Sequence, residues 1–182
     1  MDFKITEEVS GEVICATLNS VFPDGLRAIE AYEPTSKFHD IGWADYEVRM
    51  EIFFAECPYS KLVPQIKFRH SLNLFHAGNY QAALSGFDAI TPKMLYKSDR
   101  AEYLFDRAYC NLELLQYDIA YERFNEVYQL PFSDYTGPSA YAMGYIRYVE
   151  RDFSEALSWF EKSVKDSRFA QISNWYIMEC RF

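Results

Sequence analysis

Residues 68–87 read FRHSLNLFHAGNYQAALSGF, residues 105–124 read FDRAYCNLELLQYDIAYERF, and residues 141–160 read YAMGYIRYVERDFSEALSWF. The second stretch starts 37 residues after the first, and the third starts 36 residues after the second. Seven positions hold the same kind of residue in all three: an aromatic, a small residue, two bulky residues, another aromatic, an alanine and a final phenylalanine. Self-similarity at a nearly fixed period is typical of proteins built from stacked structural units. The sequence therefore predicts a repeat protein.

The spacing within each stretch predicts two helices. In the first stretch Phe68, Leu72 and Phe75 are four and then three residues apart, which places them on one face of an α-helix. Ala83 and Phe87 define a similar face on a second helix. Such a helical hairpin cannot bury its apolar face alone and needs a neighbour. We expect the small residue of each first helix to mark a close approach of the two backbones, with the alanine and the final phenylalanine packed there.

A tight turn separates the two helices of each stretch. Gly78 lies in this turn in the first stretch and can take the left-handed conformation that ends many helices. Leu115 and Arg151 stand at the equivalent positions of the other two stretches. We expect those two turns to form without a glycine.

These features resemble the tetratricopeptide repeat family, most clearly in GNYQAAL at residues 78–84 and DFSEALSWF at residues 152–160. The phrase YLFDRAYC at residues 103–110 is similar to a narrower group, the long multi-repeat members found in Gram-negative cell envelopes. The spacing exceeds the family's usual length of about 34 residues, and longer connections such as residues 91–98 account for the difference. The resemblance implies an all-α fold, a right-handed superhelix (solenoid) of antiparallel helical hairpins.

The same columns divide the chain. Residues 61–168 hold three hairpins, and residues 169–182 resemble the first helix of a further, truncated repeat. Residues 1–58 are expected to form N-terminal helices that include a degenerate or capping repeat. We expect the chain to be part of a longer array.

Charge and hydropathy restrict the partners. The net charge of −9 argues against nucleic acid, which requires a basic surface, and against an anionic membrane surface. No apolar run approaches the roughly 18 residues of a membrane-spanning helix, so we expect no direct membrane insertion. The N-terminus lacks the basic-then-apolar pattern of a secretory signal peptide. The resemblance nevertheless favours a periplasmic or outer-membrane-associated location.

The sequence predicts no enzyme, no metal site and no cofactor. The motifs of phosphate-binding loops, dinucleotide-binding folds, serine hydrolases and zinc proteases are all missing. His70 and His76 are six residues apart, on different faces of a helix, and do not match a pair of metal ligands. The four cysteines are far apart and include no C-x-x-C pair: Cys15, Cys57, Cys110 and Cys180.

The first helices of the hairpins carry the candidate binding residues. In the family resembled, these helices line a groove that binds a protein or peptide, and the groove positions here are Phe68, Leu72, Phe75, Phe105, Tyr109, Leu112, Tyr141, Tyr145 and Tyr148. Tyrosines suit this role because the hydroxyl can stay wet while the ring is covered. The alternative is that these residues are core, packed between hairpins or under the N-terminal segment. Arg107, Arg147 and Arg151 lie nearby, and we expect them to be solvated.

Together these observations predict a non-catalytic scaffold for protein–protein interaction within a larger multi-repeat cell-envelope protein. Two other hypotheses remain: a cytoplasmic adaptor or regulatory module, and a non-catalytic arm of a larger enzyme. Self-association through the open C-terminal hairpin is a further expectation, because an incomplete hairpin leaves an apolar face uncovered.

Overall fold

A computed structural model describes Met50 and residues 54–55, 58–131 and 133–181. All regular structure in these residues is helical. It comprises one 3-10 segment, η1 (Pro92–Met94), and seven α-helices: α4 (Val63–His76), α5 (Tyr80–Asp88), α6 (Arg100–Glu113), α7 (Tyr117–Tyr128), α8 (Thr136–Val149), α9 (Phe153–Ser163) and α10 (Ala170–Arg181). The predicted all-α class is thus confirmed for this part of the chain. The degenerate repeat expected before residue 58 lies almost wholly outside the described residues.

The chain divides into two compact units, residues 1–67 and residues 68–182, and the boundary falls inside α4. The described part of the first unit contains one small apolar cluster, made by Met50, Phe54, Leu62 and Ile66. The candidate binding residues all lie in the second unit.

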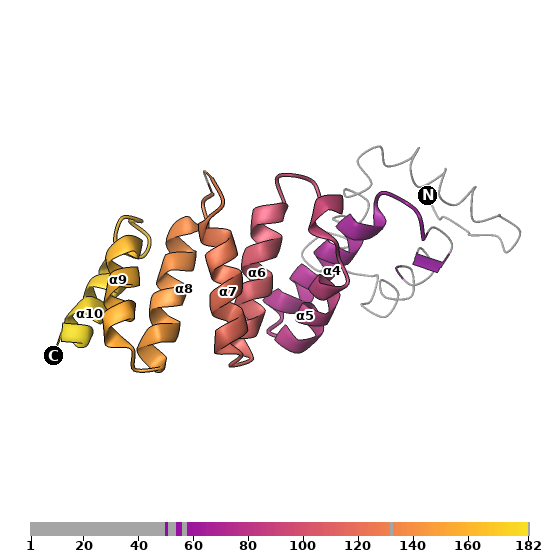
Figure 1. The fold of residues 1–182 in the computed structure, drawn as a ribbon. Helices are drawn as coiled ribbons and strands as arrows, with labels where there is room; N and C mark the ends of the chain where they lie inside the picture. The colour runs from indigo at the N-terminus through magenta and orange to yellow at the C-terminus, as the bar shows by residue number, and fades with distance from the viewer. Residues whose placement is uncertain (1–49, 51–53, 56–57, 132, 182) are drawn as a thin grey trace, which may run out of the picture. The chain divides into compact units, whose positions relative to one another are not determined.

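Helices of the second unit pack mostly on their neighbours in the sequence. From α5 to α10, each helix contacts the one that follows it. Figure 1 shows these helices succeeding one another in chain order, from magenta at α5 to yellow at α10. This arrangement agrees with a helical repeat array.

The small residue of each repeat allows the two helices of a pair to meet closely. Ser71 and Ala108 are fully buried. A Cβ atom added to Gly144 would lie 2.9 Å from the ring of Phe160, and one added to Gly86 would lie 2.2 Å from the Ser71 hydroxyl. Larger side chains do not fit at these crossings, as the sequence predicts.

The alanine and the final phenylalanine of each repeat form the core. All six side chains are 0% exposed: Ala83, Ala120, Ala156, Phe87, Phe124 and Phe160. Each phenylalanine meets the first aromatic of its own repeat, with ring centroids 6.1 Å apart in the first pair, 5.5 Å in the second and 5.9 Å in the third. The three repeats therefore bury the same contact.

The three turns have the same backbone conformation although only one contains glycine. Gly78 has φ of 77°, Leu115 of 59° and Arg151 of 65°. In each case the backbone N–H donates to the carbonyl three residues earlier, over 2.9 to 3.0 Å. Non-glycine residues rarely adopt this left-handed region, so the surrounding helix pair imposes it.

A second aromatic contact fixes the start of the later helices. Tyr135, just before α8, lies 4.9 Å from the ring of Phe105, and Phe169, just before α10, lies 5.1 Å from the ring of Tyr141. The interplanar angle is 34° in both. This contact recurs although α8 starts 36 residues after α6, and α10 starts 34 residues after α8.

Candidate functional site

The nine candidate residues fall into two groups by exposure. Phe68 and Leu72 are 0% and 3% exposed and belong to the core. The ring of Phe68 lies 6.1 Å from those of both Phe87 and Tyr103, so it is enclosed on two sides. Neither residue presents surface to a partner. The remaining seven are half-buried: Phe75, Phe105, Tyr109, Leu112, Tyr141, Tyr145 and Tyr148.

Three further half-buried tyrosines lie beside these seven: Tyr80, Tyr135 and Tyr176. The ten residues together are called the aromatic surface below. They come mainly from the first helices of the pairs, α4, α6 and α8, and from α10.

One end of the aromatic surface joins α4, α5 and α6. The ring of Phe75 lies 5.6 Å from both Tyr80 and Tyr109, and the two tyrosine rings are 6.3 Å apart. The two contacts of Phe75 are edge-to-face, the favoured geometry for aromatic pairs. These rings hold one another in defined positions while keeping part of their area in solvent.

The other end is centred on Tyr176 of α10. Its ring lies 6.1 Å from Tyr141, 6.2 Å from Tyr145 and 5.0 Å from Tyr148, three residues of α8. It also stacks on the buried Phe160 of α9, with a centroid distance of 4.8 Å and an interplanar angle of 8°. The core thus supports this end of the surface directly.

The first end extends from α6 to the start of α8. The ring of Tyr109 lies 6.3 Å from Phe105, which in turn contacts Tyr135. Burial, followed by the neighbouring Glu113 carboxylate, raises the pKa of Tyr109 to about 12, and Tyr145 contributes to the same shift. Tyr135 thus brings the first group of rings to the start of α8, and the second group begins on α8 itself at Tyr141.

The Tyr141 and Tyr135 phenols of the aromatic surface are uncharged at neutral pH. Burial, and after it the adjacent Tyr176, raises the pKa of Tyr141 to about 12. Burial, with smaller effects from Glu102 and Asp106, raises the pKa of Tyr135 to about 12 as well. The hydroxyls can therefore donate hydrogen bonds over the whole physiological range.

A network of charged groups ties α5, α6 and α7 together. Arg107 of α6 pairs with Asp88 of α5 at 2.6 Å, and Arg123 of α7 pairs with the same carboxylate at 3.3 Å. Arg123 also donates to the side-chain oxygen of Asn111 on α6. The expectation that Arg107 is merely solvated is wrong, because its guanidinium joins two helices.

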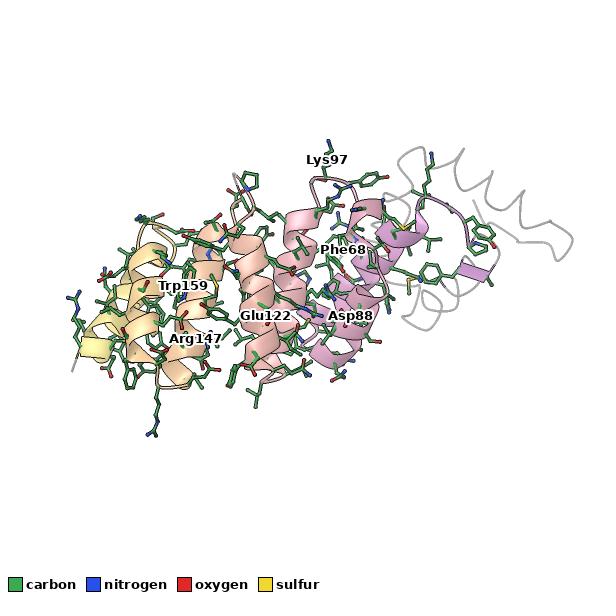
Figure 2. All side chains as sticks on the ribbon, in the orientation of Figure 1. Phe68, Asp88, Lys97, Glu122, Arg147 and Trp159 are labelled. Carbon is green, nitrogen blue, oxygen red and sulfur yellow. The ribbon has the colours of Figure 1, made fainter. Side chains whose placement is uncertain are left out.

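A second network ties α7, α8 and α9 together, and Figure 2 labels two of its members, Arg147 and Trp159. The guanidinium of Arg147 lies 3.8 Å from the centroid of the Tyr121 ring and pairs with Glu150 and Glu155 at 2.7 and 2.9 Å. The Tyr121 hydroxyl donates to Glu155 over 2.6 Å and accepts from the indole N–H of Trp159 over 2.9 Å. Arg147 is therefore a structural contact too, contrary to expectation.

The periodicity did not single out Asp106, one position after the first aromatic of the second repeat. It is 7% exposed, and burial together with Glu102 raises the pKa of its carboxyl to about 7. The other two repeats have Arg69 and Ala142 at the equivalent position. The sequence signal that could have identified Asp106 is its position four residues after Glu102, which places two carboxylates on one otherwise apolar face of the helix.

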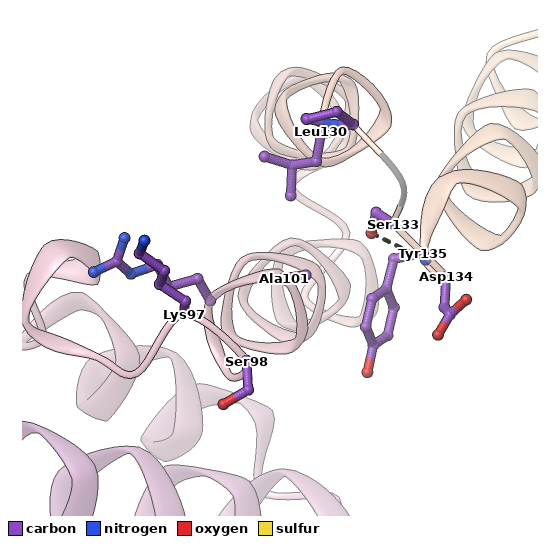
Figure 3. A pocket seen from close by; sticks show the side chains of 9 residues that line it. Lys97, Ser98, Ala101, Leu130, Ser133, Asp134 and Tyr135 are labelled. Carbon is purple, nitrogen blue, oxygen red and sulfur yellow. Dashed lines mark hydrogen bonds between the residues drawn. The ribbon is translucent and has the colours of Figure 1, made fainter.

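A pocket of about 430 Å³ opens where the connection after η1 faces the α7–α8 connection (Figure 3). Its lining combines exposed polar residues such as Lys97, Ser98 and Asp134 with apolar ones such as Leu130 and Pro131. The backbone N–H of Tyr135 donates to the Ser133 hydroxyl over 3.2 Å, which orders one wall. The Ser98 hydroxyl donates to the carboxylate of the adjacent Asp99 over 2.6 Å.

Clusters of metal ligands and membrane-spanning helices are both absent from the part of the chain that the structure describes. There, no three His, Cys, Asp or Glu side chains gather closely enough to hold a metal ion. Within the same residues, no helix has the length and apolarity needed to cross a membrane.

Comparison of the chain with protein-family models, with curated proteins and with solved structures finds no match. The likeness to tetratricopeptide repeats therefore depends on the repeated columns and on the way that the described helices pack.

Proposed function

We propose that this chain is a non-catalytic, tetratricopeptide-like scaffold whose aromatic surface binds a protein or peptide partner. One observation carries the proposal: half-buried rings from α4, α6, α8 and α10 gather in two groups, and the second group rests on the buried ring of Phe160. Tyrosine is enriched among the residues that dominate binding energy at protein interfaces. A contiguous apolar surface with polar edges is the usual mark of an interaction site.

The alternative, that the candidate residues are only core, applies to Phe68 and Leu72. The other seven differ from the core of the partner helices α5, α7 and α9, where the alanine and phenylalanine columns are 0% exposed. Tyr145 and Tyr148 are only half-buried. A partner could cover these rings and still satisfy the hydroxyls.

Rigidity supports the same function. The networks around Asp88 and Arg147 fix consecutive helices by contacts of side chains that are not part of the aromatic surface. A surface that is already ordered loses little conformational entropy when a partner binds. Affinity then depends largely on burial of the rings.

We further infer that the helix pairs are antiparallel hairpins of a right-handed superhelix, with α10 as the first helix of another repeat. The phrase at residues 103–110 supports a place in a larger cell-envelope protein. The two other hypotheses, a cytoplasmic adaptor and a non-catalytic arm of an enzyme, also require a partner to bind at this surface. The binding test therefore applies to all three hypotheses.

The test compares this chain with a variant that combines Tyr109→Ala, Tyr145→Ala and Tyr148→Ala. Both are used to capture partners, which are identified by mass spectrometry and then measured as purified proteins by calorimetry. A matched control combines Tyr59→Ala and Tyr96→Ala, which remove rings that are 98% and 46% exposed outside the aromatic surface. Circular-dichroism melts establish that all three chains are folded.

The expected result is a partner that binds the parent and the control and loses at least tenfold in affinity for the triple variant. Equal affinity for all three chains contradicts the proposal. If the triple variant unfolds, the single Tyr145→Ser and Tyr148→Ser variants replace it, because each removes one ring and keeps a hydroxyl.

A further inference from the structure

Two carboxylates on α6 lie next to the aromatic surface. Glu102 and Asp106 are four residues apart and therefore share one face of the helix, with Phe105 adjacent. Asp106 is 7% exposed, and within the described residues it forms no hydrogen bond or ion pair. Its oxygens are nevertheless not fully enclosed. A carboxyl group in such a position is unfavourable unless a partner satisfies it.

The nearby cations of the chain are engaged elsewhere. Arg107 and Arg123 both pair with Asp88. Arg100 donates to the backbone carbonyls of Leu95 and Lys93, over 3.2 and 2.9 Å. Among the described residues, none of these arginines neutralises Glu102 or Asp106, so the negative charge of this helix face is available to a partner.

Aromatic rings border the same two carboxylates. The ring of Tyr135 lies 4.9 Å from that of Phe105, the residue that precedes Asp106, with the two planes tilted by 34°. Both carboxylates raise the pKa of the Tyr135 phenol, which places its hydroxyl within their field. Cations are attracted to aromatic faces as well as to carboxylates, and the two attractions act together here.

We propose that Glu102 and Asp106 bind a lysine or arginine side chain of the partner, beside the rings of Phe105 and Tyr135. This inference rests on the proposed function and adds the class of segment that is bound: a basic residue flanked by apolar ones. Arginine fits better than lysine, because its planar guanidinium can donate to two carboxylates and stack on a ring at the same time. The excess of negative charge, −9 over the chain, also draws basic segments toward it.

The experiment selects random twelve-residue peptides, displayed on phage, for binding to the whole chain. Peptides that also bind the Tyr109→Ala, Tyr145→Ala, Tyr148→Ala variant are discarded. The expected peptides contain arginine or lysine next to an aromatic or aliphatic residue. One of them is then synthesised, together with a copy in which citrulline, a neutral residue of nearly the same shape, replaces the arginine.

Affinity for the arginine peptide should fall about tenfold in Asp106→Asn and in Glu102→Gln, the usual effect of losing a charge-assisted hydrogen bond. Glu122→Gln, an exposed carboxylate of α7, is the matched control and should leave affinity unchanged. The citrulline peptide should bind the parent weakly and should not distinguish the parent from Asp106→Asn. Both site variants retain side-chain shape, and melts verify that they are folded.

Affinity for the arginine peptide should also rise between pH 6 and 8, because a bound cation favours the ionised form of Asp106. The titratable groups that face Asp106 are Glu102 and Cys110 on α6 and Tyr135 before α8. Burial raises the pKa of both Cys110 and Tyr135 to about 12, so these two do not ionise in this range.

The outcomes separate the two proposals. If no peptide prefers the parent over the triple variant, the aromatic surface does not bind peptides, and both proposals fail. If the selected peptides lack a cation, or if arginine and citrulline peptides bind equally, the cation site is wrong while the aromatic surface stands as a binding site.

Discussion

The guanidinium of Arg147 lies 3.8 Å from the centroid of the Tyr121 ring, so a residue of α8 is held against a residue of α7. This contact joins the first helix of one repeat to the second helix of the preceding repeat. Arg147 also pairs with Glu155 on α9, the second helix of its own repeat. A single side chain therefore bridges three consecutive helices.

Replacing Arg147 by alanine should lower the free energy of unfolding by about 1–2 kcal/mol, because a cation–π contact and partly exposed ion pairs are lost together. Urea denaturation measures this change. Arg181→Ala is the control, since the Arg181–Glu161 pair is more than half exposed on both sides and should contribute less than about 0.5 kcal/mol. Equal effects of the two substitutions would show that the bridge does not stabilise the fold.

Glycine in place of Leu115 or Arg151 should stabilise the chain by about 0.5–1 kcal/mol each, because both residues have a left-handed backbone that disfavours side chains. Leu115 is 69% exposed and gives up little packing. The reverse change, Gly78→Ala, should destabilise by a similar amount through backbone strain, since no atom lies within 4 Å of the added Cβ. Thermal melts of the three variants test the sign of each change.

Truncation of Phe124 to alanine should destabilise the chain by about 3–5 kcal/mol, because the side chain is 0% exposed and leaves a cavity between helices. Phe153→Ala, at a ring that is 43% exposed, should cost much less. Chemical denaturation of both variants provides the comparison. A small effect at Phe124 would mean that the core column collapses readily around the gap.

The stability of the chain should fall as pH rises from about 4 to 7 through the contribution of Asp106. Burial raises the pKa of this carboxyl to about 7, above the 3.8 of an exposed aspartate, so the folded state holds a proton that the unfolded state has released. Its contribution is fully present below about pH 4 and is lost by about pH 7.

The Asp106→Asn variant should therefore have a flatter profile and be more stable than the parent at pH 8, by about 1–3 kcal/mol. Urea denaturation across this pH range, with the exposed Asp118→Asn as control, measures the difference. A parent profile that rises between pH 4 and 7 and is unaltered in Asp106→Asn would contradict the assignment.

The core between paired helices could be predicted from the sequence because the residues that form it recur in each repeat. The small, alanine and phenylalanine columns are packing requirements that each repeat must meet separately, so three copies show the same pattern. The exposure of the bulky columns could not be predicted in the same way. Phe68 is enclosed because Tyr103 of the next repeat covers it, whereas the position equivalent to Tyr103 in the third repeat is Ser139, and Phe105 stays half-exposed.

Other features could not be predicted from the sequence because they depend on contacts between neighbouring repeats, and the residues that make these contacts differ from one repeat to the next. Arg147 meets Tyr121, but the equivalent position in the second repeat is Asn111, which binds Arg123 instead. The left-handed turns at Leu115 and Arg151 contradict local preference and arise from the packing of the helices that they join.

The ring contacts of Tyr135 with Phe105 and of Phe169 with Tyr141 have nearly the same geometry. They recur although α8 starts 36 residues after α6, whereas α10 starts 34 residues after α8. Each new helix is thus positioned by a side-chain contact at its first turn rather than by the length of the preceding connection. A difference of two residues in the spacing therefore leaves the ring contact at the start of the helix in place. Designers could likewise lengthen the connections to carry an added epitope or a labelling tag.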